Sequence, residues 1–476
     1  MKKALLILLL VLLGLGWWFY QREEGRDWQG KEAVIPLEQV VPQPLDQPQY
    51  GKGIVRFSPD SRYLAVASQG GKVRIMETKN QKLLWEKTMG IGCVKYLAFS
   101  PDSKYLFLGE ESPDGNLYCF SLLQKKIVWQ YSTGKDLGSN LAKKSYPVVN
   151  RIVLDPQTNK VYFSAGRWEK VGEGQYSHQG RIYACQADVG QLVWKFPAQK
   201  NLPVNSKYID VDSAGKILVF STTGNSDDLG LADYPPGLIG CLETEQGQEL
   251  WQKRIPAYKP FFQATNFSQS PSISGDGKYI ALITNDGRGF LLDREGNTLW
   301  EKELTAPSRE IEGVSLYAPG TFAGFAGGQV IFRTANTYDA WQKRPELPLE
   351  HPNGNSIFAY SLAGDLLWKW QAKGYMPQMQ IRDNYLLIPV EKNFRTQDLT
   401  VQGVYLLDMA QGQQKKAALV ETYHSATQGG IISADLSPDG RYVAALEVPL
   451  LLADKSIVGK SQLHLWRPVK NFRKLF

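Results

Sequence analysis

The chain contains few of the residues that most often carry out chemistry in proteins. It has four cysteines and four histidines among 476 residues, and none of them forms a HExxH, CxxC or CxxCH pattern. A GxSxG nucleophile motif is also missing. The sequence therefore lacks the usual signatures of a zinc site, a c-type haem site or a hydrolase elbow. We predict no catalytic residue, no metal and no cofactor, and we interpret the cysteines as small buried residues.

A concentrated block of charge is also absent. The net charge is +7, and the lysines and arginines are scattered along the chain. A nucleic-acid surface usually shows basic residues gathered on one stripe with stacking aromatics among them. We therefore predict no nucleic-acid partner.

Only the N-terminus contains a long apolar run, from Ala4 to Tyr20, with Lys2 and Lys3 before it. A run of about 17 residues is short for a membrane-spanning helix and slightly long for a cleaved signal. The aromatic cluster that ends it favours an uncleaved anchor at residues 1–20, a single pass through the cell membrane with the lysines inside. The rest of the chain is then expected outside the cytoplasm, in the periplasm or on the cell surface, or secreted if the run is cleaved.

Residues 21–50 contain four prolines and read as a linker with one possible strand at 33–41. The folded part follows at residues 51–476. Its unit is clearest from Gly53 to Gly90, where four short alternating strands are joined by a Ser-Pro-Asp-Ser turn, a Gly-Gly turn and a polar corner. A lone sheet of four strands leaves one apolar face uncovered, so such a unit must stack against a neighbour.

Copies of this unit follow one another to the C-terminus. Each has a turn rich in Asp or Gly, an alternating strand and, in six copies, a closing tryptophan at Trp85, Trp129, Trp194, Trp251, Trp300 and Trp368. The seventh copy lacks the tryptophan and the eighth stops after its third strand. This pattern predicts an all-β fold, an eight-bladed β-propeller, with seven blades as the alternative. The strand at 33–41 would supply the missing outer strand of the eighth copy and close the ring.

Two sequence patterns resemble known propellers. The first resembles the tryptophan-docking repeat of the PQQ-like (quinoprotein-type) propellers and is clearest in YACQADVGQLVWKF, FLLDREGNTLW and CLETEQGQELW. The second is similar to the turns of WD-repeat-like bacterial propellers and is found in SPDSRYLAVAS and SPDGRYVAALE. The resemblance spans Gly53 to Val469 and implies the propeller fold. Such propellers include dehydrogenases and assembly scaffolds, so the resemblance does not choose between functions.

The resemblance also implies what a quinone enzyme of this family would need. Such enzymes hold their cofactor with a disulfide of adjacent cysteines and a calcium bound by Glu, Asn and Asp. Here the cysteines are isolated, at Cys93, Cys119, Cys185 and Cys241. A quinoprotein oxidoreductase is therefore an alternative, as is an envelope-assembly factor resembling the outer-membrane-assembly propeller lipoprotein, although no lipid-anchoring cysteine follows the apolar run.

The connections between strands differ in length. First-to-second and third-to-fourth turns are short, whereas second-to-third and inter-blade connections are long, and in a four-stranded blade these two sets lie on opposite faces. Long loops and exposed aromatic or arginine side chains are typical of interfaces. The candidate partner-binding residues are Trp168, Tyr176, His178, Tyr234, Phe261, Phe262, Tyr338, Trp341, Arg344, His351, Phe394, Arg395, Tyr423, His424 and Leu451.

We therefore expect a membrane-anchored extracytoplasmic propeller that acts as a non-catalytic binding or scaffold protein. Its expected partner is a protein of the cell envelope, bound through the long-loop face. The alternative interpretation of this face is that the loops fold back and cap the aromatic core of the ring.

Overall fold

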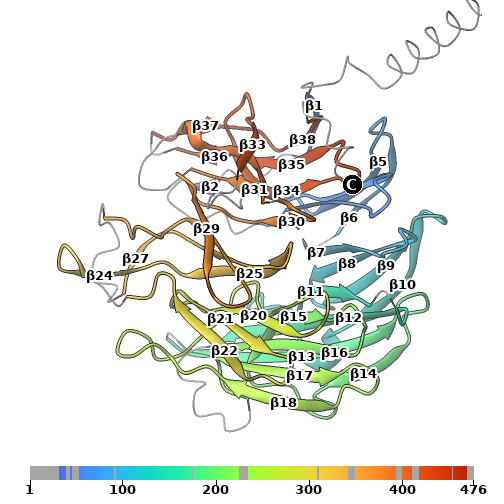
Figure 1. Ribbon diagram of the computed structural model, residues 1–476. Helices are drawn as coiled ribbons and strands as arrows, with labels where there is room; N and C mark the ends of the chain where they lie inside the picture. The colour runs from blue at the N-terminus through green and yellow to red at the C-terminus, as the bar shows by residue number, and fades with distance from the viewer. Residues whose placement is uncertain are drawn as a thin grey trace, which may run out of the picture.

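The fold is all-β. The computed structural model describes residues 32–38, 43–44, 53–89, 93–155, 157–173, 175–224, 234–307, 310–340, 349–392, 399–409, 418–452 and 454–468. Within these ranges the only helical elements are α2 (Gly134–Leu137) and η3 (Leu399–Val401). Twisted antiparallel sheets stand around a common axis and form a β-propeller, which confirms the predicted fold (Figure 1).

Most sheets consist of four strands that follow one another in the chain. The N-terminal sheets are β3 (Ile54–Phe57), β4 (Tyr63–Ala67), β5 (Lys72–Glu77) and β6 (Leu83–Thr88), then β7 (Cys93–Phe99), β8 (Tyr105–Glu111), β9 (Asn116–Ser121) and β10 (Lys126–Ser132), then β11 (Val148–Leu154), β12 (Lys160–Lys170), β13 (Tyr176–Gln186) and β14 (Leu192–Phe196). The central ones are β15 (Asn205–Val211), β16 (Ile217–Thr223), β17 (Leu238–Glu243) and β18 (Glu249–Arg254), then β19 (Ser272–Ile273), β20 (Tyr279–Ile283), β21 (Arg288–Asp293) and β22 (Thr298–Glu303).

The C-terminal half continues the pattern with insertions. Its sheets are β25 (Gly320–Ala326), β26 (Gln329–Thr334), β28 (Ser356–Tyr360) and β29 (Leu366–Gln371), then β30 (Gln380–Arg382), β31 (Tyr385–Val390), β32 (Gly403–Asp408) and β33 (Ala418–Tyr423), then β34 (Gly430–Leu436), β35 (Val443–Val448), β38 (Gln462–Trp466) and β1 (Glu32–Pro36). Two small sheets belong to the connections: β2 (Gln43–Pro44) with β36 (Leu450–Leu451) and β37 (Ile457–Val458), and β23 (Glu310–Ile311) with β24 (Val314–Tyr317) and β27 (Tyr338–Asp339).

The four-strand groups correspond to the eight copies found in the sequence. One pair, Val148 with Glu111, joins β11 to β8, so that β7 to β14 form a single eight-stranded sheet. Eight blades is our interpretation of this division, with β7–β10 and β11–β14 counted separately.

The first and last strands of the propeller lie side by side. β1 pairs antiparallel with β38, from Glu32 opposite Trp466 to Pro36 opposite Gln462. Ile35 packs against the apolar cluster between this sheet and β3–β6. The strand expected at 33–41 thus occupies residues 32–36 and is the outer strand of the sheet that begins with β34; residues 39–41 lie outside the described ranges.

The membrane or signal helix predicted at residues 1–20 also lies outside the described ranges. Among the residues that the structure describes, we find no helix with the length and apolar character needed to cross a membrane.

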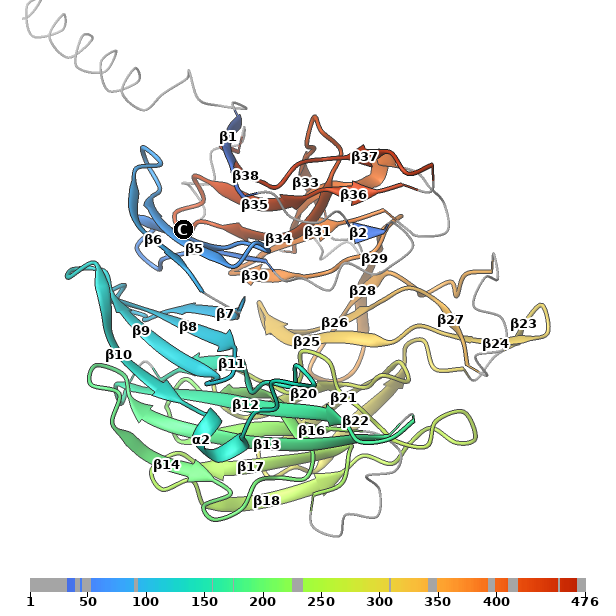
Figure 2. The ribbon, with the colours of Figure 1, turned by 180° about the vertical axis from the view of Figure 1, so that it is seen from behind.

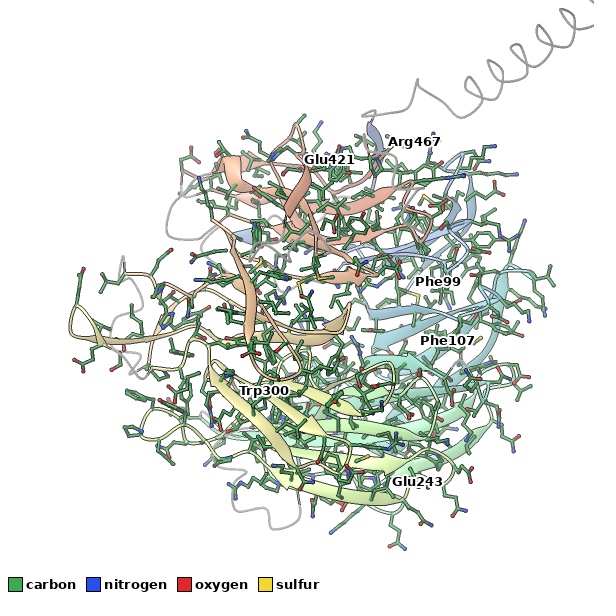
Figure 3. All side chains as sticks on the ribbon, in the orientation of Figure 1. Phe99, Phe107, Glu243, Trp300, Glu421 and Arg467 are labelled. Atoms are coloured by element: carbon green, nitrogen blue, oxygen red, sulfur yellow. The ribbon has the colours of Figure 1, made fainter. Side chains whose placement is uncertain are left out.

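The recurring tryptophans connect neighbouring sheets. Trp194 on β14 donates its indole N–H to the carbonyl oxygen of Thr244 at 2.9 Å, in the β17–β18 turn of the next sheet. The same bond joins Trp251 to Arg294 at 3.0 Å, and Trp300 to Leu362 at 3.0 Å. Figure 3 labels Trp300 on the β19–β22 sheet. Gly247 in the docked turn has φ +74, and a Cβ there would lie 2.6 Å from the Trp194 ring. In the copies that end at Trp129, Trp194, Trp251 and Trp300, the tryptophan ring therefore lies against the turn glycine of the next sheet.

The aspartates of the SPD turns have a structural role, as their turn position suggested. Asp60 accepts hydrogen bonds from Ser58 Oγ at 2.6 Å and from the Arg62 N–H at 3.1 Å. Its own N–H donates to Ser103 Oγ in the next sheet, at 3.1 Å. These turns thus stabilise themselves and tie adjacent sheets together on one face of the ring.

Candidate partner-binding face

In the described part of the chain, the second-to-third connections and the passages between sheets lie on one face of the propeller, which we call the looped face; the face with the first-to-second and third-to-fourth turns is the plain face. Backbone hydrogen bonds join an inter-sheet passage to a second-to-third connection, as in Ile255 N–H to Gly237 O at 2.8 Å and Gly180 N–H to Leu202 O at 2.9 Å. In Figure 2 the end of the β12–β13 hairpin, the β23–β24 loop and β36–β37 project to one side, and the turns after β5 and β9 lie on the other.

A long hairpin dominates the first part of the looped face. β12 and β13 each span 11 residues and pair from Lys160–Gln186 to Lys170–Tyr176. Near its end Trp168 is 54% exposed and its ring lies 5.6 Å from that of Tyr176, edge to face. Val171 at the tip is 58% exposed, and the half-buried His178 lies opposite Trp168 in the register.

Polar contacts hold this hairpin against the loop that precedes β11. Lys143 Nζ lies 2.8 Å from Glu169 Oε1, and Arg167 pairs with the other oxygen of the same carboxylate. Ser145 Oγ donates to the carbonyl oxygen of Trp168 at 2.6 Å. The hydrogen bond from Lys143 is the main cause of the lowered pKa of Glu169. The aromatic pair is therefore presented on a hairpin that is already fixed in place, which reduces the entropy lost on binding.

A second group of aromatic side chains lies between the β19–β22 and β25–β29 sheets. The rings of Phe262 and Tyr317 are 5.0 Å apart, edge to face, and those of Tyr317 and Tyr338 are 6.0 Å apart. Phe261 stacks on Tyr258 at 6.4 Å. Tyr338 is 39% exposed, so this row reaches the surface at one end.

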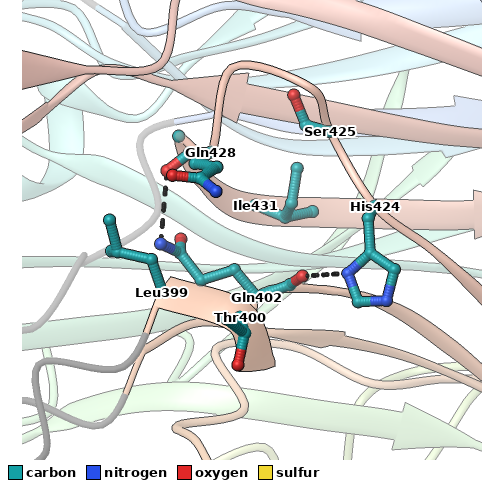
Figure 4. A pocket seen from close by; sticks show the side chains of 8 residues that line it. Leu399, Thr400, Gln402, His424, Ser425, Gln428 and Ile431 are labelled. Carbon is teal, nitrogen blue, oxygen red and sulfur yellow. Dashed lines mark hydrogen bonds between the residues drawn. The ribbon is translucent and has the colours of Figure 1, made fainter.

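A pocket of about 260 Å³ forms the third part of the looped face, between η3 and the passage from β33 to β34. His424 is exposed at its edge, with Nδ1 2.7 Å from the carbonyl oxygen of Gln402 (Figure 4). The Gln402 side chain donates to the carbonyl oxygen of Gln428 at 3.2 Å. The volume is just below the range of most ligand pockets, so the pocket suits one small side chain or group.

Two of the predicted contact residues are buried and offer little surface. His351 is 8% exposed, and its Nδ1 accepts the N–H of Asn353 at 3.1 Å. Tyr423 is 6% exposed and its ring lies 5.3 Å from that of Trp466. Both are therefore packing residues: Tyr423 is the last residue of β33, and His351 is bonded within its own loop.

Of the remaining predicted residues, Tyr234 and Leu451 are described and four others are not. Tyr234 is half-buried, with its ring 6.0 Å from Phe196, and donates its hydroxyl to Glu249 at 3.2 Å. Leu451 is half-buried on β36. The residues that lie outside the described ranges are Trp341, Arg344, Phe394 and Arg395.

Some residues of the looped face could not be singled out from the sequence. Leu141, 64% exposed beside the hairpin, and Tyr317 in the aromatic row lie in segments without a recurring pattern. Glu447 is different, because a carboxylate within the apolar strand β35 is a visible signal of a buried, fully bonded acid. It lies behind the pocket and fixes the loop that carries His424.

The cysteines behave as small core residues. Cys119, Cys185 and Cys241 are fully buried on the third strands β9, β13 and β17. Burial raises the pKa of all three thiols, to about 12 for Cys185 and Cys241. All four cysteines are free, so they do not form the adjacent-cysteine disulfide that the resemblance to quinone enzymes implies.

Taken together, the closed arrangement of sheets, the docked tryptophans and the loops of the looped face define a PQQ-like propeller. Residues 133–415, more than half of the chain, match the family model described as outer membrane protein assembly factor BamB, and the chain belongs to this family. This confirms the resemblance to the PQQ-like propellers.

Solved structures show the same fold. The C-terminal WD40 domain of Sif2 is 12% identical with a TM-score of 0.59, covering 93% of this chain and 99% of that one. The Dos1 propeller is 10% identical with a TM-score of 0.56, covering 93% and 95%. The computationally designed Ika8 protein is 12% identical with a TM-score of 0.54, covering 92% and 100%. At such identities the likeness concerns the fold alone.

Proposed function

We propose that this protein is a non-catalytic scaffold of the cell envelope that binds a protein partner through its looped face. In this proposal residues 1–20 anchor the chain in the membrane and the propeller lies outside the cytoplasm. The family description, an outer membrane protein assembly factor, supports a partner within an envelope-assembly complex.

The observation that carries the proposal is the exposed apolar end of the β12–β13 hairpin. Trp168, Val171 and Tyr176 are all exposed there, together with the neighbouring Leu141. The charged residues Lys143, Arg167 and Glu169 lie beside them. A compact apolar group with a polar rim is the usual composition of a protein–protein interface, and tryptophan and tyrosine are favoured at its centre.

Substitutions at the hairpin test this proposal. We expect the double variant Trp168→Ala, Val171→Ser to recover at least tenfold less partner than wild type in a pull-down from solubilised membranes, because loss of one interface tryptophan costs about 2 kcal/mol or more. The matched control is Leu123→Ser, since Leu123 is 90% exposed in the β9–β10 turn of the plain face. Both variants should keep the melting temperature of wild type, because the substituted side chains are exposed.

The informative comparison is between the two variants rather than with an empty resin. Equal recovery of partner by the hairpin variant and the plain-face control would remove the hairpin from the binding surface.

A further inference from the structure

Basic side chains from different sheets gather at the propeller axis. Figure 1 shows the innermost strands β7, β11, β15, β25, β30 and β34 around the middle of the molecule. Burial lowers the pKa of Arg56 on β3, and three charged groups from other sheets also act on it: Asp435 on β34 raises it, and Arg382 on β30 and Arg151 on β11 lower it. Residues from four separate sheets can act on one another in this way only where the sheets converge.

Contacts between the sheets support this placement. With the Gln380 amide oriented so that its oxygen faces Arg56, that oxygen accepts from the guanidinium at 2.9 and 3.2 Å. Arg382 Nη2 lies 3.2 Å from Asp435 Oδ1, and the Arg151 guanidinium lies 5.2 Å from the centre of the Tyr96 ring. These contacts join β3 to β30, β30 to β34 and β11 to β7.

Further cations lie toward the looped face. Lys95 and Lys207 are near the starts of β7 and β15, and Lys95 is among the charges that act on Lys207. Arg333 lies at the looped-face end of β26. Burial lowers its pKa, and the nearby Tyr375 and Tyr208 act in the opposite direction. We call these cations together the axial cluster. Its six members are Arg56, Lys95, Arg151, Lys207, Arg333 and Arg382.

Fewer carboxylates accompany the axial cluster, and these are already engaged. Among the described residues they are Asp210, Asp435 and Glu111, three against six cations. Asp210 accepts from the Ile273 N–H at 3.0 Å and from Ser272 Oγ at 3.1 Å. Asp435 accepts from the Phe57 N–H at 2.8 Å in addition to Arg382. The carboxylate oxygens of Asp210 and Asp435 thus already accept hydrogen bonds from backbone amides. With three carboxylates for six cations, positive charge is in excess.

Arg333 shows this excess most directly. It is 1% exposed, and its Nε donates to Thr321 Oγ1 at 3.0 Å. Its Nη1 has no hydrogen-bond partner among the described residues. Burial lowers the pKa of Arg333 to about 10, and the groups that oppose this are the hydroxyls of Tyr375 and Tyr208. A buried guanidinium without a carboxylate partner is costly, because its lost hydration is not replaced.

Water reaches the axis beside these groups. Lys207 is exposed although its strand neighbour Ser206 is fully buried. Arg56, Arg151 and Arg382 are likewise half-buried on innermost strands. Arg56, Lys95, Arg151, Lys207 and Arg382 therefore have surface that water can reach, whereas the side chain of Arg333 is buried.

We propose that the propeller axis is a binding site for a small multivalent oxyanion, a phosphate or a polycarboxylate, held by the axial cluster. Guanidinium groups bind such oxygens in planar pairs of hydrogen bonds, and the anion supplies negative charge that the nearby carboxylates do not. The site is separate from the partner-binding residues of the looped face and does not depend on them.

Thermal unfolding of the full chain tests the site, with inorganic phosphate in one arm and citrate in the other, at an ionic strength held constant with sodium chloride. A ligand that binds only the folded state raises the melting temperature in proportion to its occupancy. We expect phosphate, citrate or both to raise it above the chloride control. Phosphate alone would identify a phosphate site and citrate alone a carboxylate site. No rise with either anion would overturn the proposal.

Variants locate the effect. Arg151→Gln, which removes a half-buried cation, should weaken the binding of the active anion by about tenfold, since a charged hydrogen bond contributes roughly that factor. Arg333→Met should melt above wild type in chloride and gain less from the anion, because an apolar chain replaces an uncompensated charge. The control Arg62→Gln lies on the plain face with a side chain 70% exposed, and should respond as wild type does. Equal responses of Arg151→Gln and Arg62→Gln would contradict an axial site, whether or not Arg333→Met folds.

Discussion

Glu447 is the most fully bonded acid behind the looped face, and its substitution gives a quantitative test of how that face is held. Its carboxylate is fully buried on β35. It lies 2.5 Å from His464 Nε2 and accepts from the Gly429 N–H at 2.8 Å. It also accepts from Ser425 Oγ and Thr427 Oγ1, both at 2.6 Å. Three of these donors belong to the loop from 425 to 429, which lines the pocket.

The size of the effect follows from the pKa. Burial alone raises the pKa of Glu447, but the hydrogen bonds from His464, Ser425, Thr427 and Gln462 outweigh it and lower the pKa from 4.5 to about 2. Because the folded pKa lies below the unfolded one, this stabilisation is present above about pH 4.5 and is lost as the pH falls toward 2. A difference of this size corresponds to about 3 kcal/mol of unfolding free energy.

We expect Glu447→Gln to lower the free energy of unfolding by about 3 kcal/mol at pH 7 and by much less near pH 2. Urea unfolding followed by tryptophan fluorescence at both pH values measures the difference. Glu245→Gln is the control, since Glu245 is exposed in the β17–β18 turn and should unfold as wild type does. A Glu447→Gln penalty that is the same at pH 7 and pH 2 would show that the carboxylate charge is not what holds the loop.

Three further substitutions or reactions test the ring itself. Gly247 and Gly313 have φ values of +74 and +72, but only at Gly247 would a Cβ meet a tryptophan ring, at 2.6 Å. Gly247→Ala should therefore lower the free energy of unfolding by about 3 kcal/mol and Gly313→Ala by about 1 kcal/mol, as measured by urea unfolding. Ile35→Asp should lower the melting temperature by several degrees because Ile35 packs in the seam between first and last strands, whereas Val34→Asp, at a position 45% exposed, should change it little; equal effects would argue against the seam. In the native protein a thiol reagent should modify the half-buried Cys93 first and leave the three fully buried thiols unreacted until unfolding; modification of all four together would contradict their burial.

Local sequence signals were enough to predict the propeller. The turn and strand of each copy, and the tryptophan of six copies, repeat at short range. They have direct counterparts in the structure, such as the docking of Trp194 on the turn that contains Gly247. The outer strand at 32–36 could be predicted because the eighth copy visibly lacked one. Strand periodicity and turn chemistry are local properties, so they survive without knowledge of the three-dimensional contacts.

The candidate sites were harder to predict, because they depend on contacts between distant segments. The loop lengths indicated the looped face, but they did not distinguish exposed Trp168 from buried Tyr423, which differ only in what packs over them. The axial cluster gave no sequence signal at all. Arg56 and Arg382 are separated by more than 300 residues, and each is a single cation on a short strand until the sheets converge.

The most direct test of the central proposal is site-specific photocrosslinking in intact cells. A photoreactive residue at position 168, on the hairpin of the looped face, should form a covalent adduct with an envelope protein, and the same residue at position 123 on the plain face should not. Adducts that form from position 123 and not from position 168 would place the partner on the opposite face and contradict the account.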